Sequence, residues 1–178
     1  MAPGLEKLTC EVWIKAAVFA LLILNAGIYL ASGTFSDGLD SIAWLTLLAL
    51  FELETGLAPI LRTGPAVAIV HAIRLICVAA IGIAAAGYLY NSEWLDAANS
   101  GLWIAVVALL EVGVRRPAAV ATQRARFTAA AAMLYAGLLA VVLVWLWRGE
   151  WFDAYDAALW LVGFATIEMN VLRARKAE

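Results

Sequence analysis

Charged residues are scarce in this sequence, and their scarcity excludes an ordinary soluble domain. Lysine, arginine, aspartate and glutamate together make up 15% of the 178 residues, whereas hydrophobic residues make up 65% and the mean hydropathy is +0.90. A soluble domain carries about 25% charged residues, because its surface faces water. The composition therefore predicts an integral membrane protein whose surface faces the lipid bilayer.

Cysteine and histidine are also rare. Cys10 and Cys77 are not spaced as a metal pair, and both are predicted on the cytoplasmic half, where disulfides are uncommon. His71 is the single histidine, and one histidine without a second ligand argues against haem or a transition metal. No Ser-His-Asp or Cys-His set and no glycine-rich phosphate loop can be assembled. We therefore expect no enzyme, no catalytic residue, no metal and no cofactor, with bound lipid as the one ligand left open.

Proline is absent from the long apolar stretches, so no helix there is expected to break. These stretches are each near the ~20 residues that cross a bilayer, and 39–56 is the shortest. They cover roughly 10–32, 39–56, 66–90, 95–115, 125–148 and 153–174. The sequence thus predicts an all-α bundle of six transmembrane helices.

Basic residues are missing from three of the five predicted loops, apart from Arg148. Most of the others fall at the two ends of the chain and in the second and fourth loops: Lys7, Arg62, Arg115, Arg116, Arg124, Arg126, Arg173, Arg175 and Lys176. Cytoplasmic loops are the ones enriched in lysine and arginine, so both termini are expected in the cytoplasm. High alanine and arginine usage favours a bacterial inner membrane. No cluster of basic and aromatic residues suggests nucleic-acid binding.

One pattern occurs three times: an Asp, six residues, a Trp, seven residues and a Glu. The copies are Asp37-Trp44-Glu52, Asp96-Trp103-Glu111 and Asp153-Trp160-Glu168, with Asp40, Asn99 and Asp156 three residues after the first Asp. Such regular recurrence predicts repeated structural units. We expect a single transmembrane domain over residues 1–178, built from two-helix hairpins at about 8–56, 66–115 and 124–174.

The repeated glutamates lie in apolar surroundings, where an acid is costly and its presence suggests a function. On an ideal helix each Glu lies about 60° from its Asp and roughly 22 Å along the axis. If the three Glu residues face a common axis, they form a carboxylate ring that binds cations or shares protons. If they face neighbouring helices, each pairs with a base. Candidate bases are Arg115, spaced i,i+4 from Glu111, Lys15 across the first hairpin, and Arg74, which matches Lys15 in the second.

The aspartates and tryptophans also allow two interpretations. Asp37, Asp96 and Asp153 begin helices, where they cap free amides, or they belong to an acidic outer vestibule of seven carboxylates. The other four members are Asp40, Glu93, Glu150 and Asp156. Trp44, Trp103 and Trp160 lie about 10 Å deeper than the aspartates, too deep for an interfacial belt. They either pack against a neighbouring helix or line a pathway.

Two functions fit these features about equally. The first is a small channel or transporter whose repeated acids shape a cation or proton path. The second is a non-catalytic structural or assembly subunit of a larger membrane complex. Association with copies of itself or with partner subunits is expected in either case. An enzyme acting on lipid or quinone is disfavoured, since no catalytic set is present.

Overall fold

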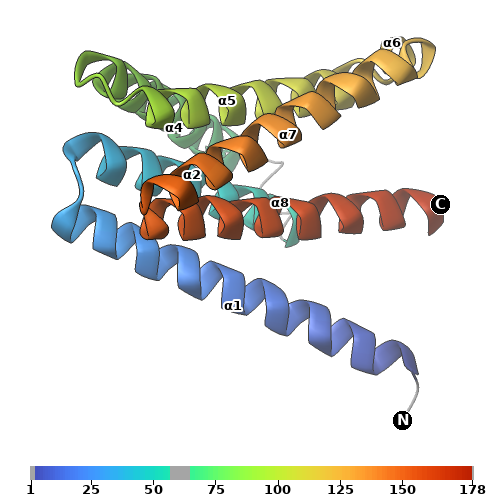
Figure 1. The fold of residues 1–178 in the computed structure, drawn as a ribbon. Helices are drawn as coiled ribbons and strands as arrows, with labels where there is room; N and C mark the ends of the chain where they lie inside the picture. The colour runs from blue at the N-terminus through green and yellow to red at the C-terminus, as the bar shows by residue number, and fades with distance from the viewer. Residues whose placement is uncertain (1–2, 57–64, 178) are drawn as a thin grey trace. The chain divides into compact units, whose positions relative to one another are not determined.

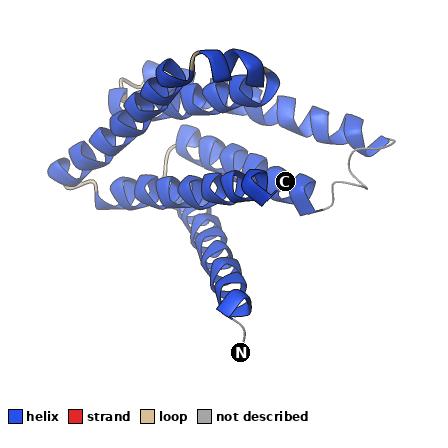
Figure 2. Ribbon diagram, turned by 90° about the vertical axis from the view of Figure 1, so that its right-hand side faces the viewer, coloured by secondary structure: helices blue, strands red, loops and turns tan. Residues whose placement is uncertain are grey.

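The computed structural model describes residues 3–56 and 65–177, and in these residues every regular element is a helix (Figure 2). The all-α class predicted from the sequence is therefore confirmed for the described part of the chain. The chain divides into two compact units, Met1–Asn91 and Ser92–Glu178. The division falls inside the predicted second hairpin, and the threefold hairpin arrangement stays a prediction.

The described part of the first unit contains three helices: α1 (Pro3–Ser32), α2 (Phe35–Gly56) and α4 (Pro65–Tyr90) (Figure 1). Helix α2 contacts both α1 and α4. Leu22 of α1, Ala43 of α2 and Ala84 of α4 are among the buried residues. The closest approach joins α2 to α4, where the Ser36 hydroxyl lies over Gly87 and occupies the space that a Cβ at residue 87 would need. Glycine at this position lets the two helices pack tightly.

The second unit contains α5 (Trp94–Arg115), the six-residue α6 (Pro117–Thr122), α7 (Arg124–Arg148) and α8 (Trp151–Ala177). Helix α7 contacts both α5 and α8, and α6 forms the link between α5 and α7 (Figure 1). The core comprises residues of α7 and α8, and α5 packs Leu95 and Leu102 against it. Its buried members are Val141, Val142, Trp145, Ala154 and Ala157. The connection between α5 and α7 thus contains a short helix.

The helices that carry the repeated pattern begin at equivalent positions, two residues before each repeated Asp. Their first residues are Phe35, Trp94 and Trp151. The turn before α2 is a capping box, in which Asp37 Oδ2 accepts from the Thr34 amide at 2.8 Å and Thr34 Oγ1 accepts from the Asp37 amide at 3.3 Å. Local sequence therefore determines where α2 starts.

The turn between α7 and α8 is formed by Gly149, whose φ of 79° lies in the left-handed region. Its amide donates to Leu146 O, and the next amide, of Glu150, donates to Trp145 O at 2.9 Å. This is the Schellman pattern, which satisfies the last carbonyls of a helix and favours glycine. Ser92, between α4 and α5, has a φ of 63° and is the one non-glycine residue with positive φ in the described chain.

Among the described residues, four helical segments are long and apolar enough to cross a membrane, which indicates a helical membrane protein. They are Trp13–Ser32, Pro65–Tyr90, Trp94–Gly113 and Arg124–Arg148. At most 22% of the apolar window of any of them is buried, so most of their apolar surface is not covered within the units. The other two predicted spans, over 39–56 and 153–174, lie in α2 and α8 and stay predictions.

Candidate functional site

The glutamate of the first repeat forms an ion pair with the base proposed for it. Lys15 Nζ of α1 lies 3.0 Å from Glu52 Oε1 and 3.3 Å from Oε2 of α2. Both side chains are about one-third exposed, at 32% and 30%. In a lipid-facing bundle such a pair compensates two charges that would each be costly alone. It also ties α1 to α2.

A second ion pair joins α2 to its other neighbour. Arg74 of α4, the residue that matches Lys15 in the repeat, has its Nη2 2.5 Å from Glu54 Oε2. Glu54 follows Glu52 by two residues, which places it about 200° around the helix. Helix α2 therefore offers one acid to α1 and another to α4. Glu54 is not part of the repeated pattern, so the sequence analysis did not select it. Its spacing from Glu52 nevertheless predicts that the two acids lie on different faces of α2.

The other two repeated glutamates differ from Glu52. Glu111 accepts a hydrogen bond from Arg115 one turn later on α5, and both side chains are more than half exposed. This pair lies within one helix and joins no two elements. The Glu168 side chain lies outside the described residues. A carboxylate ring of Glu52, Glu111 and Glu168 therefore stays a prediction.

The first outer aspartates take part in local bonds. Asp37 belongs to the capping box, and Asp40 Oδ1 accepts from Trp44 Nε1 at 3.2 Å. Asp96 and Asp153 lie in the first turns of α5 and α8, and Asp156 lies one turn later on α8. All three are partly buried and have interactions of their own. The acidic vestibule stays a prediction.

The repeated tryptophans lie inside their units or at the edge of the unit's core. Trp44 and Trp103 are buried, with 9% and 5% of their surface exposed, and Trp160 is partly buried. Trp103 of α5 packs on Phe164 of α8, with ring centroids 4.7 Å apart. The ring centroid of Trp160 lies 6.4 Å from that of the same Phe164 ring. Two repeats thus supply one aromatic cluster between α5 and α8.

Three buried polar atoms near the start of α5 have no hydrogen-bond partner. They are Glu93 Oε2, Asn99 Oδ1 and Ser100 Oγ. Ser100 is only 1% exposed. Sequence reasoning did not single out Ser100, and it noted Glu93 only as a member of the acidic vestibule and Asn99 only as a member of the repeat. The one sequence feature that could have indicated these atoms is that the second repeat has Asn99 where the first repeat has Asp40.

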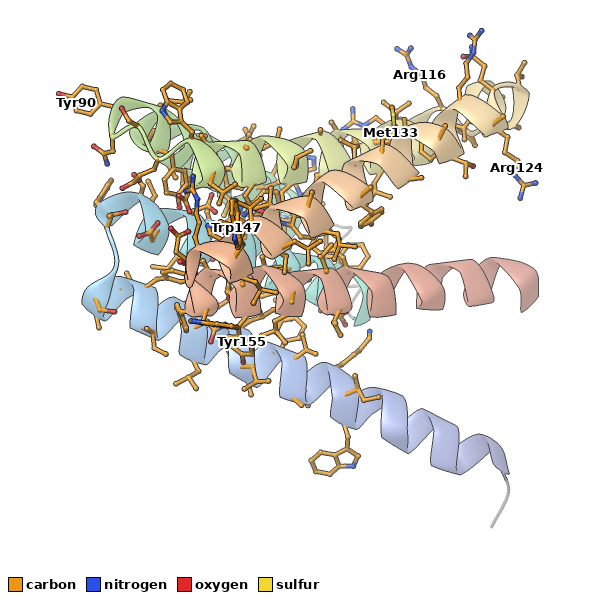
Figure 3. All side chains as sticks on the ribbon, viewed as in Figure 1. Tyr90, Arg116, Arg124, Met133, Trp147 and Tyr155 are labelled. Atoms are coloured by element: carbon orange, nitrogen blue, oxygen red, sulfur yellow. The ribbon has the colours of Figure 1, made fainter. Side chains whose placement is uncertain are left out.

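The described residues contain no group of three or more His, Cys, Asp or Glu side chains that could hold a metal ion. Basic side chains gather at the opposite end of the second unit, where Arg116 and Arg124 flank α6 and extend away from it (Figure 3). Arg115 and Arg126 are exposed there too. Their chemistry suits anionic lipid headgroups.

Compared with known protein families, curated proteins and solved structures, the chain matches none. Functional inference therefore rests on the residues and contacts described above.

Proposed function

We propose that the chain is a small channel or transporter that moves cations or protons across a bacterial inner membrane. The observation that carries this proposal is the Lys15–Glu52 ion pair, because it joins two helices at a half-buried position. A proton or a cation that binds Glu52 leaves the lysine without its counter-charge. The contact between α1 and α2 then weakens, and such coupling between charge and helix contact is what ion-driven transport requires.

The second ion pair supports a bundle in which only one contact needs to open. Arg74–Glu54 holds α2 to α4 independently of the pair with Lys15. The Ser36–Gly87 approach strengthens the same α2–α4 contact. Helix α1 is therefore the element that breaking the Lys15–Glu52 pair would release.

The two ends of the second unit support the proposed orientation. Exposed aromatic side chains lie where α5 and α8 begin and α7 ends, at Trp94, Trp151 and Trp147. Exposed arginines lie at the other end, around α6. Aromatic residues are typical of an interface, and arginines are enriched on the cytoplasmic side. On this basis the arginine-rich end of the second unit is its cytoplasmic end.

The test is cation and proton flux in liposomes that contain the purified protein, with a charge swap as the decisive variant. Glu52→Gln should lower flux at least tenfold. Exchanging the two residues, Lys15→Glu with Glu52→Lys, restores the attraction but moves the carboxylate to α1. If transport requires the carboxylate to be on α2, the swapped protein should fold but should not transport. Glu111→Gln is the matched control, because that pair joins no two helices, and it should keep normal flux.

A non-catalytic subunit of a larger membrane complex is the second candidate, favoured by the observation that Glu52 and Glu111 are already paired with bases. Full flux in the swapped protein would show that the pair is architecture. No flux in the wild-type protein, together with larger partners retained in native mass spectrometry, would establish the subunit function instead.

A further inference from the structure

Four arginines surround the short helix α6, where α5 ends and α7 begins. They are Arg115, Arg116, Arg124 and Arg126, and all four are exposed. The two long helices are close together at this end, because the Phe127 ring of α7 packs over Gly113 of α5. A Cβ at residue 113 would lie 3.2 Å from Phe127 Cζ. The packing of α5 on α7 thus gathers these arginines around α6 in one surface, which we call the arginine corner.

The arginine corner carries positive charge that the described part of the chain does not neutralise. Arg115 donates to Glu111 of α5, but no described carboxylate pairs with Arg116 or Arg124. The side chains of Arg116 and Arg124 extend away from the ribbon (Figure 3). In the sequence, no acidic residue lies between Glu111 and Glu150. An anionic partner would therefore meet exposed guanidinium groups that are free to pair with it.

The segment between the arginines is apolar. Helix α6 has the sequence PAAVAT, and most of its residues are exposed. Its one hydroxyl, of Thr122, donates to Ala118 O at 3.0 Å, so it needs no other partner. The helix connects two segments that are long and apolar enough to cross a membrane, Trp94–Gly113 and Arg124–Arg148. A link this short between two membrane spans lies at the membrane surface, where apolar groups flanked by bases are stable.

We propose that the arginine corner binds anionic phospholipids, with their phosphate groups on the arginines and α6 lying among the headgroups. Guanidinium groups pair well with phosphate oxygens, through two parallel hydrogen bonds. The acyl chains of such lipids would lie along α5 and α7, whose apolar surface is mostly uncovered within the unit. The corner is a surface rather than a pocket, so different arginines can bind different lipids.

Nucleic acid also carries phosphate, but the corner fits it less well. Proteins that bind single strands add exposed aromatic side chains on which bases stack. The exposed aromatic side chains described for this unit lie at its opposite end, at Trp94, Trp147 and Trp151. The proposed lipid surface goes beyond the transport function, because it needs neither an ion path nor the Lys15–Glu52 pair.

The experiment is lipid binding to the delipidated full-length protein, measured by native mass spectrometry in a neutral detergent. The probes are phosphatidylglycerol, which has a net negative charge, and phosphatidylcholine, which has the same phosphodiester but no net charge. We expect phosphatidylglycerol to bind at least about tenfold more tightly, and this preference should shrink as the salt concentration rises.

Single arginine variants locate the binding surface. Arg116→Gln and Arg124→Gln should each weaken phosphatidylglycerol binding about fivefold, which corresponds to about 1 kcal/mol. Arg148→Gln is the matched control, because it removes an exposed arginine from the other end of α7, where Glu150 lies 3.9 Å away and already compensates the charge. It should bind phosphatidylglycerol as the wild type does. All three side chains are exposed, and unchanged thermal unfolding midpoints would verify that the variants fold.

The lipid surface is wrong if the wild type binds both lipids equally, or if both corner variants bind as the wild type does. An equal loss in Arg148→Gln would overturn it too, since net charge alone would then explain the effect. A short DNA oligonucleotide that binds more tightly than phosphatidylglycerol would replace it with a nucleic-acid surface. The assay uses no gradient, so lipid preference without ion flux would keep the surface and overturn transport, and flux without lipid preference would do the reverse.

Discussion

At the residue scale, polar groups in this chain differ in whether the chain itself supplies their partner. Asp37, Asp40 and Glu52 have partners within hydrogen-bond distance, and each of these bonds joins the side chain to a turn or a helix. Such bonds make a polar residue compatible with an apolar bundle. Glu93 Oε2 and Ser100 Oγ lack this compensation.

Gly149 gives the first prediction at this scale. Its left-handed φ of 79° is costly for any residue with a Cβ, so Gly149→Ala should destabilise the second unit by about 1 kcal/mol. The thermal unfolding midpoint in detergent measures this effect. Gly101→Ala is the control, since a Cβ there meets no atom within 4 Å and the residue lies inside α5. An equal loss in both variants would contradict the conformational explanation.

The sequence suggests residue partners where they are local or where charge leaves few choices. Spacing alone suggested Glu111 with Arg115, and the structure places them together. The partner of Arg74 was not foreseen, because a repeat aligns residues within equivalent hairpins whereas Arg74 contacts the preceding hairpin. The unpaired oxygens were not foreseen either, since burial depends on tertiary contacts that spacing does not contain.

At the element scale, α2 is held on both sides by different chemistry. It carries four acids, which explains why it does not reach the apolarity of a candidate span. Two of these acids pair with bases on its neighbours. Helix position was predictable from apolar runs and turn residues, as the start of α2 at a capping box shows. Which helices pack against α2 depends on contacts between small residues, and apolar runs alone do not specify these contacts.

The Ser36–Gly87 approach allows a test of that packing. A Cβ at residue 87 would overlap the Ser36 hydroxyl. It would lie 3.4 Å from the Ser36 Cβ, which is an ordinary contact distance. Gly87→Ala should therefore lower the thermal unfolding midpoint, and adding Ser36→Ala should recover most of the loss. The two changes should be non-additive by about 1 kcal/mol, as expected for residues in contact. Additive effects would show that the hydroxyl is not the obstacle.

At the scale of the whole molecule, composition determined the class before any contact was known. The scarcity of charge predicts a membrane protein, and four described helices have the required length and apolarity. What composition leaves open is whether α2 and α8 also cross. Each has two acids at its start, and α2 has two more near its end whereas α8 has one more, Glu168. Hydropathy alone therefore does not distinguish a span from a helix that lies along the surface.

Single-cysteine labelling decides this for α8 and tests the orientation in the same experiment. After Cys10 and Cys77 are replaced by alanine, one cysteine is introduced at Thr122, Glu150 or Ala177. If α7 and α8 both cross, a membrane-impermeant thiol reagent added to intact cells should label only the variant at Glu150. The other two should react only after lysis, because the arginine-rich end of α7 and the end of α8 would be cytoplasmic. Labelling at Ala177 in intact cells would show that α8 does not cross, and the predicted six-span topology would then be wrong.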